Sequence, residues 1–256
     1  ESVLAGVDVV VHLAARVHMM NDRAADPLAE FRRVNTQGTL VLAEAAARAG
    51  VKRFIFLSTV KVNGEATLPG QPFRSTDAPQ ASDPYGISKQ EAEAALLELA
   101  RTTGLEVTII RPPLIYGPGV KGNFRSLIKA LRRGIPLPLG GITGNLRSLV
   151  GVDNLISLIS VSMTHPAAAN ATFLVSDGQD VSTTGLLQAL TRAMGLKPRL
   201  LPVPAGAIQL LAGLAGKKAA ADRLVGNLQV DISDTREKLG WTPPVSLDAG
   251  MKAAVD

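Results

Sequence analysis

Apolar positions in the first half of the chain form short continuous runs, separated by longer segments with a different period. The runs at 7–13, 53–58 and 106–111 predict buried strands of a parallel sheet, because such strands are apolar on both faces. Segment 28–49 carries small or apolar residues at helical spacing, and Asp83 and Pro84 are typical of residues that begin a helix over 85–103. Alternating strands and helices predict an α/β fold with a parallel sheet.

Beyond residue 118 the pattern is less regular. It predicts helices over 124–133, 153–163 and 183–194, short strands at 136–139, 146–150, 172–175 and 199–203, and further helical pieces to the end. We expect the apolar segment 208–214 to form an amphipathic helix that packs on the core. The domain boundary is therefore expected near residue 118, with residues 119–256 as a smaller lobe and about 148–176 returning to the sheet.

Composition narrows the class of protein. Of 256 residues, 46% are apolar and 19% charged, which excludes a disordered chain. The chain has no cysteine and only three scattered histidines, so we expect no disulfide and no metal site. No apolar run reaches the roughly twenty residues of a membrane span. The net charge is +5, but the cations are dispersed and aromatics make up 4%, so we expect no nucleic-acid partner.

Tyr85 and Lys89 form a Tyr-x-x-x-Lys pair at the start of the second predicted helix. Four-residue spacing places the phenol and the ammonium on one face of that helix, one turn apart. A nearby cation and the positive end of the helix both favour phenolate. We therefore expect the pKa of Tyr85 to fall from about 10 towards neutrality, where the phenol can act as a general acid and base.

Two hydroxyl residues, Ser58 and Thr59, end the second predicted strand. Open α/β sheets bind their ligands at the carboxyl ends of the strands. A hydroxyl at this position is able to hold a substrate alcohol or ketone while Tyr85 transfers the proton. A strand that ends in hydroxyl residues is followed by a helix with the Tyr-x-x-x-Lys pair and then by another strand. This order therefore predicts an enzyme.

The chain resembles the extended short-chain dehydrogenase/reductase family, in particular its nucleotide-sugar epimerases, dehydratases and 4-ketoreductases. The matching pieces occur in the family's order over nearly the whole chain, at 9–15, 34–39, 56–64, 84–89, 111–118, 147–154 and 239–243. The resemblance implies a Rossmann-like parallel sheet in residues 1–118 and a substrate-binding lobe mainly in residues 119–256. It also implies NAD as cofactor, with NADP possible.

The resemblance assigns roles to particular residues. Thr59, Tyr85 and Lys89 are implied to be the catalytic triad, and Lys89 is also implied to bond the nicotinamide ribose. The implied cofactor-binding residues are Leu13, Ala14, Ala15, Asn35, Ser58, Tyr85, Lys89 and Pro112. Asn123 and Arg147 resemble residues that hold the diphosphate of a nucleotide sugar, and guanidinium groups bind phosphate oxygens bidentately. An Asn inside a helix is equally able to bond a neighbouring loop, so both roles of Asn35 stay open.

The family's activities leave alternatives. We expect an epimerase acting at C4 of a UDP-hexose or UDP-N-acetylhexosamine through a 4-keto intermediate, ahead of an NAD(P)H-dependent 4-ketoreductase. A dehydratase ranks third, because Val60 and Lys61 supply no acidic group beside Thr59. A non-catalytic dinucleotide-binding scaffold is the alternative outside the enzymes. By the resemblance, we also expect a cytoplasmic homodimer with a UDP-sugar as its small-molecule partner.

The family's glycine fingerprint, Gly-x-x-Gly-x-x-Gly after a first strand, has no counterpart in these 256 residues. Its glycines and the following helix N-terminus cradle the pyrophosphate of the dinucleotide. The resemblance therefore implies a chain that is short by roughly two βα units at its N-terminus. We expect the 256 residues alone to be poorly soluble and to bind no dinucleotide, since the first strand would be an exposed apolar edge.

Overall fold

A four-stranded parallel sheet is the centre of the computed structural model, which describes residues 2–17, 26–120 and 122–256. Its order is β1-β2-β3-β6, from β1 (Val9–His12), β2 (Arg53–Leu57), β3 (Glu106–Arg111) and β6 (Ala171–Leu174). His12 pairs with Phe56 and Leu57 with Ile110, so the strands end close together at one edge. The α/β fold with a parallel sheet predicted from the sequence is confirmed.

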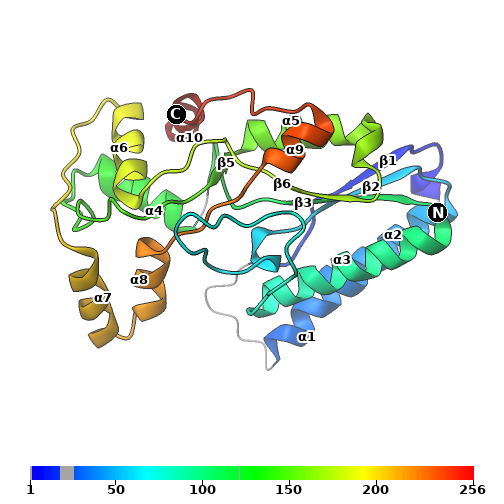
Figure 1. Ribbon diagram of the computed structural model, residues 1–256, viewed down its shortest axis with the longest axis horizontal. Helices are drawn as coiled ribbons and strands as arrows, with labels where there is room; N and C mark the ends of the chain where they lie inside the picture. Colours follow the sequence, from blue (N-terminus) through cyan, green and yellow to red (C-terminus); the bar gives the residue numbers. More distant parts are fainter. Residues whose placement is uncertain (1, 18–25, 121) are drawn as a thin grey trace.

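Helices cover both faces of this sheet (Figure 1). α2 (Gly38–Arg48) and α3 (Pro84–Thr103) lie on one face, and α5 (Val152–Thr164) and α9 (Ser233–Leu239) lie on the other. Neighbouring side chains of β2 divide between the two layers: Phe54 and Phe56 pack with Leu96 of α3, whereas Ile55 packs with Leu158 of α5. The alternation of side chains along a strand thus builds two cores from one sheet.

The C-terminal lobe has a third core and a two-stranded parallel sheet of β4 (Leu114–Tyr116) and β5 (Leu149–Gly151). The helices of this part of the chain are α4 (Gly122–Arg132), α6 (Thr183–Ala193), α7 (Ala205–Leu214), α8 (Lys218–Val225) and α10 (Leu247–Val255). Strand β6 joins the main sheet beside β3. The proposed boundary near residue 118 stays a prediction.

Several local expectations are wrong. The strands expected at 136–139 and 199–203 reduce to an isolated bridge between Leu137 and Leu200, and the strand 114–116 was not expected. The helix expected over 28–49 is confirmed as one continuous run, made of α1 (Pro27–Phe31), a π-helical segment (Arg32–Gln37) and α2. Shorter 3₁₀ segments lie at Ser2–Leu4, Val60–Val62 and Pro166–Ala168. Short bridges depend on contacts distant in sequence, which local patterns do not record.

The helix expected over 208–214 forms as α7, and Ile208 packs against the core as expected, but most of the helix is not enclosed. None of its residues is buried, and Leu210, Leu211 and Leu214 are exposed to solvent. Among the described helices, none combines the length and apolar character that crossing a membrane requires.

Candidate active site

Thr59, Tyr85 and Lys89 are brought together at the edge where the strands end. Thr59 directly follows the strand β2 and its Ser58, and it is 9% exposed. The backbone N–H of Val60 donates to the carbonyl of Pro112 at 2.9 Å, which fixes this turn beside the end of β3. The Thr59 hydroxyl also lies near the Tyr85 phenol, close enough to lower its pKa.

Tyr85 is held at the first turn of α3. Asp83 is the N-cap, and its carboxylate accepts a hydrogen bond from the backbone N–H of Gly86 at 2.6 Å. Lys61 pairs with the same carboxylate, so the helix start is tied to the turn after Thr59. The Tyr85 ring packs edge-on against Phe31, with ring centroids 6.0 Å apart. These contacts orient the phenol towards Thr59.

Lys89 lies one turn further along α3 and is fully buried. Its Nζ donates to the carbonyl of Leu57 at 2.8 Å and lies 4.2 Å from the centroid of the Phe56 ring. Burial lowers the pKa of Lys89 to about 8, and the nearby charge of Glu93 acts in the opposite direction. The ammonium therefore sits beneath the strand end with a pKa close to neutrality.

The expected low pKa of Tyr85 is wrong for this chain. Burial and, to a smaller extent, the charge of Asp83 raise the pKa of Tyr85 to about 12, although the nearby Thr59 hydroxyl acts to lower it. The N-cap that starts the helix thus places a carboxylate beside the phenol. Desolvation disfavours phenolate more strongly than the Thr59 hydroxyl favours it.

A buried ion pair between Arg111 and Glu93 lies next to the site, and it was not predicted from the sequence. The Arg111 guanidinium bonds Glu93 at 2.6 Å and 3.0 Å and donates to Asn63 at 3.1 Å. The hydroxyl of Ser58 donates to Glu93 as well. Ser58 therefore faces the interior and does not share the task of Thr59. Glu93 continues the Tyr85 and Lys89 face at a further four residues, which is the signal that the sequence offered.

Asn35 is held in the π-helical segment and is completely buried. Its side chain accepts from the backbone N–H of Arg16 at 2.8 Å and donates to the Arg16 carbonyl and to Ser88, both at 3.0 Å. Asn35 therefore fixes the loop after β1, which carries Leu13 and Ala14, to helix α3. This is the loop-bonding role left open above, and its proximity to a cofactor stays a prediction.

Leu13, Ala14, Ala15 and Pro112 lie where the strands β1 and β3 end. Leu13 and Ala14 are exposed, and Pro112 is buried. Short and exposed side chains at a strand end leave the backbone open to a flat ligand, as a nicotinamide nucleotide requires. The predicted positions are thus compatible with a cofactor at this edge.

Arg147 lies in the C-terminal lobe, apart from the Thr59 and Tyr85 pair. Its Nη1 donates to the carbonyls of Arg223 at 2.8 Å and Gly226 at 3.3 Å. Burial and the neighbouring charge of Arg223 both lower the pKa of Arg147. The Arg147 guanidinium is thus held by backbone carbonyls, and Arg223 is a second cation near it. Arg223 was missed because the contact joins residues 76 positions apart. The side chain of Asn123 lies outside what the structure describes.

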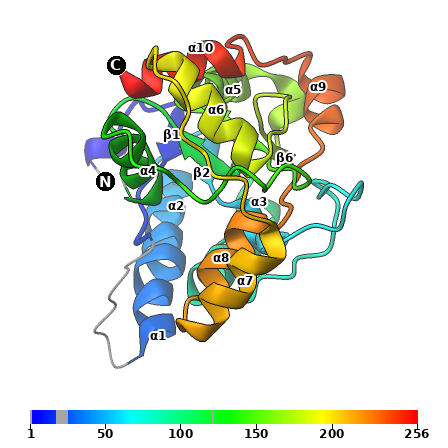
Figure 2. The same cartoon turned by 90° about the vertical axis from the view of Figure 1, so that its left-hand side faces the viewer.

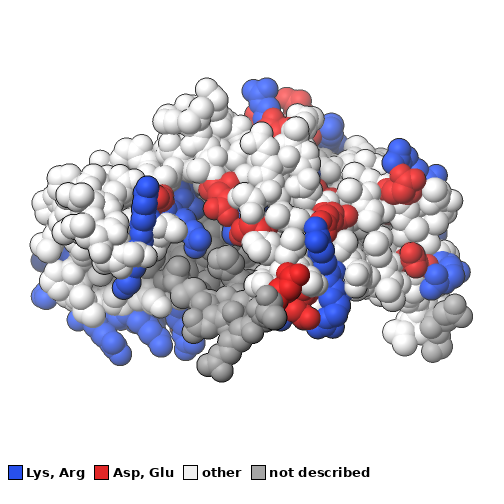
Figure 3. Space-filling view, turned by 90° about the horizontal axis from the view of Figure 1, so that it is seen from below, with Lys and Arg blue, Asp and Glu red and all other residues white. Residues whose placement is uncertain are grey.

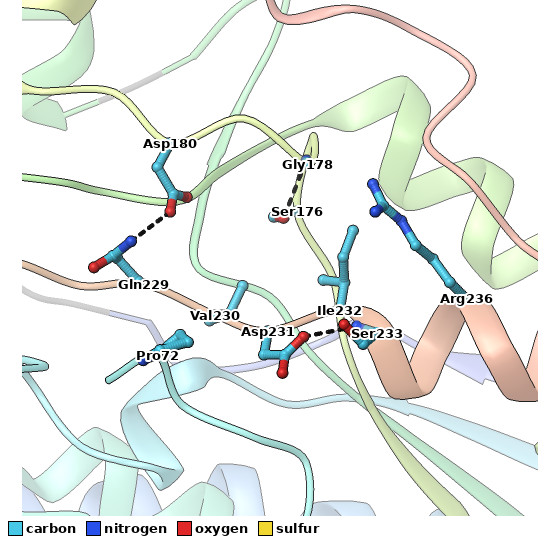
Figure 4. Close-up of a pocket in the computed structure, with 10 residues that line it drawn as sticks. All are labelled: Pro72, Ser176, Gly178, Asp180, Gln229, Val230, Asp231, Ile232, Ser233 and Arg236. Carbon is cyan, nitrogen blue, oxygen red and sulfur yellow. Dashed lines mark hydrogen bonds between the residues drawn. The ribbon is translucent and has the colours of Figure 1, made fainter. Parts of the chain in front are cut away.

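A separate pocket of about 220 Å³ lies beyond the end of β6 (Figure 4). It contains none of the predicted site residues. Gln229 donates to Asp180 at 2.7 Å and Asp231 accepts from Ser233 at 2.9 Å, whereas the side-chain oxygen of Gln229 is buried and has no hydrogen-bond partner among the described residues. In the described part of the chain, no cluster of three or more His, Asp or Glu residues is placed to hold a metal ion, and His18 lies outside that part.

His12 gives the fold a dependence on pH. Burial and the charge of Lys89 lower its pKa below the ordinary value of 6.5. An unfolded His12 therefore takes up a proton at a higher pH than the folded one, so the free energy of unfolding decreases as the pH falls through about 6.5. The variant His12→Phe keeps the packing on Phe54 and Phe56. We expect its urea midpoint to fall less than that of the parent between about pH 7 and about pH 5.5. Parallel curves for the two proteins would rule out this role.

Comparisons with known proteins agree with this geometry. Residues 1–175 match the family described as "NAD dependent epimerase/dehydratase family". A Vibrio cholerae protein named UDP-glucose 4-epimerase is 53% identical over 249 residues, which cover 97% of this chain and 76% of that protein. The crystal structure of UDP-glucose 4-epimerase with UDP-glucose from Thermotoga maritima matches with a TM-score of 0.73 and 29% identity, covering 97% of this chain and 76% of the other.

A further structural relative shows the fold. The crystal structure of UDP-glucuronic acid 4-epimerase from Bacillus cereus, in complex with NAD, matches with a TM-score of 0.78 at 22% identity. The match covers 100% of this chain and 74% of that one. The Rossmann-like arrangement inferred from the resemblance is therefore confirmed.

Proposed function

The chain belongs to the NAD dependent epimerase/dehydratase family, and we propose that it is an epimerase acting at C4 of a UDP-hexose or UDP-N-acetylhexosamine. The observation that carries this proposal is the 53% identity to a UDP-glucose 4-epimerase over nearly the whole chain. The meeting of Thr59, Tyr85 and Lys89 at the strand ends supports it, because proton transfer at a sugar hydroxyl needs such a group.

Tyr85 is the proposed proton carrier. In this proposal its phenol oxygen takes the proton of the C4 hydroxyl as the sugar becomes a 4-keto compound, and it returns the proton when the hydroxyl is restored. Thr59, whose side chain lies near the Tyr85 phenol, holds the same sugar oxygen. The Lys89 ammonium stabilises negative charge that develops on the phenol, which offsets the raised pKa of Tyr85.

The residues at the strand ends fit the cofactor for which the family is named. Leu13 and Ala14 leave the end of β1 open, Pro112 lies at the end of β3, and the Lys89 ammonium lies beside the end of β2. When bound there, NAD supplies a nicotinamide that accepts a hydride from C4 and gives it back. NADP is equally part of this proposal, because none of the residues named here distinguishes the 2′-hydroxyl of NAD from the 2′-phosphate of NADP.

Arg147 and Arg223 are the proposed diphosphate contacts. Their guanidinium groups lie close enough to lower the pKa of Arg147, and a diphosphate between them would relieve that repulsion. We include Asn123 in the same site on the resemblance alone. The homodimer and the cytoplasmic location expected from the sequence also remain part of this proposal.

Turnover of a defined substrate tests the activity. UDP-glucose is incubated with catalytic amounts of NAD and the protein extended by the two N-terminal βα units that the resemblance implies. It should give UDP-galactose, with no net change in NADH absorbance at equilibrium. Stoichiometric consumption of NAD(P)H with a 4-keto-6-deoxy substrate, together with no epimer from UDP-glucose, would instead assign the protein as the 4-ketoreductase considered above.

A further inference from the structure

Helix α7 is an apolar helix left on the surface. Gln209 is the one polar side chain among its ten residues, yet none of the ten is buried by the rest of the described chain. Leu210, Leu211 and Leu214 are 67%, 63% and 81% exposed. Their spacing places all three on one face of the helix. A helix that is apolar on all sides normally lies in a protein core or in lipid, so this exposure needs an explanation.

The helices α7 and α8 form a hairpin at one end of the molecule (Figures 1 and 2). Its inner side is fixed to the lobe, because Ala205 and Ile208 pack against the third core. Gln209 donates to Asp222 of α8 at 3.1 Å, which joins the two helices. The leucines of the opposite face are therefore held outward by a defined structure.

Basic residues outnumber acidic ones in and around this hairpin, whose one acidic residue is Asp222 of α8. Residues 181–221 contain five Lys or Arg and no Asp or Glu, and residues 107–152 contain seven Lys or Arg and again no Asp or Glu. The two stretches pack together through the bridges Leu137–Leu200 and Gly141–Pro204. Lys217 and Lys218 follow the exposed leucines directly. Figure 3 shows this end of the molecule as a largely uncharged area that carries and is bordered by Lys and Arg, with a few acidic side chains on its inner side.

We propose that the α7–α8 hairpin docks the protein on an anionic lipid bilayer. Leu210, Leu211 and Leu214 enter the boundary between headgroups and acyl chains, while Lys217 and Lys218 bind the headgroups. A ten-residue helix is about 15 Å long, half the thickness of the hydrocarbon core, so α7 lies in the interface and does not cross it. The sequence led us to expect no membrane partner. This proposal keeps only the part of that expectation that concerns a helix spanning the membrane.

The charges favour a bilayer over the other occupants of such a face. A second copy joined by a two-fold axis would bring Lys217 and Lys218 of both copies together, and like charges oppose that contact. An anionic bilayer combines an apolar interior with a negative surface, which is the pattern that this hairpin complements. The proposal is independent of the reaction that the enzyme catalyses.

Vesicle co-sedimentation tests the docking surface. The protein should bind vesicles of phosphatidylcholine with about 30% phosphatidylglycerol, and bind pure phosphatidylcholine much less. The triple variant Leu210→Ser/Leu211→Ser/Leu214→Ser should lower the partition coefficient at least about tenfold, because its charge is unchanged and its apolar face is lost. The double variant Lys217→Ala/Lys218→Ala should lower it roughly 25-fold on anionic vesicles.

Matched variants elsewhere provide the controls. Ile156→Ser removes an apolar side chain that is 54% exposed on α5, and Lys252→Ala removes an exposed cation of α10. Both should bind anionic vesicles as the parent does. The proposal is overturned if the parent does not bind these vesicles, or if the triple Ser variant binds equally well. Sedimentation velocity that shows loss of a dimer in the triple variant, without vesicle binding by the parent, would assign the face to a second copy.

Discussion

Tyr85→Phe lowers kcat by about 100-fold or more while the affinity for the UDP-sugar changes little. This is the usual scale for loss of a general acid and base. The substitution retains the aromatic ring that packs against Phe31 and removes the phenol oxygen that meets Thr59. Steady-state kinetics with UDP-glucose measure kcat, and titration calorimetry with UDP measures binding to the site.

The second tyrosine is a matched control. Tyr116 is buried in the C-terminal lobe, and its hydroxyl donates to Asp177 at 2.7 Å. Tyr116→Phe removes an equivalent hydroxyl, so it should lower the free energy of unfolding by about 1–3 kcal/mol and leave kcat nearly unchanged. Equal kcat values in Tyr85→Phe and the parent would defeat the catalytic assignment.

Arg147→Ala should have the opposite kinetic signature. A diphosphate contact is made in the ground state and in the transition state alike, so its loss raises KM and leaves kcat close to that of the parent. Arg192→Ala, which removes an exposed arginine paired with Asp248, is the corresponding control. A fall in kcat with unchanged KM in Arg147→Ala would place this residue outside the diphosphate site.

Glu93→Ala lowers the free energy of unfolding by about 3–5 kcal/mol. The side chains of Glu93 and Arg111 are 5% and 6% exposed, so removal of the carboxylate leaves a buried guanidinium without its counter-charge. Replacing both partners, as Glu93→Leu/Arg111→Met, should recover much of the loss because no charge remains buried. Urea unfolding followed by circular dichroism measures both variants.

A neighbouring ion pair on the same helix tests the physical reason. Glu91 pairs with Arg32 at 2.6 Å, but these side chains are 35% and 45% exposed. Water screens such a pair, so Glu91→Ala should cost no more than about 1 kcal/mol. If Glu91→Ala and Glu93→Ala destabilise the protein equally, burial is not what makes the Glu93–Arg111 pair important.

Local patterns predict the sheet and its main helices well. The strands expected at 53–58 and 106–111 are observed as Arg53–Leu57 and Glu106–Arg111, and the helix expected over 85–103 is Pro84–Thr103. Apolar runs and N-cap residues are each defined by a few consecutive positions. These strands and this helix can therefore be predicted without knowledge of which distant residues they contact. The exposure of α7 does depend on distant contacts, since an apolar segment of that length is ordinarily buried.

In the candidate site, too, the features set by nearby residues were predicted, and the features set by contacts between distant residues were not. Helical spacing correctly places Tyr85 and Lys89 on one face, with Thr59 at the nearby strand end. The raised pKa of Tyr85 was not predictable, because it depends on burial in the folded chain. The contacts of Ser58 and Arg111 with Glu93 join residues 35 and 18 positions apart, and sequence spacing does not report them.

Isotope retention at C4 tests the central claim most directly. UDP-glucose that carries deuterium at C4 is incubated with the protein and NAD, and the product is examined by proton NMR and mass spectrometry. If Tyr85 moves only the hydroxyl proton while the hydride leaves and returns to the same carbon, UDP-galactose keeps the deuterium at C4. Loss of the label to water, or its recovery at C6, would contradict the proposed C4 epimerisation.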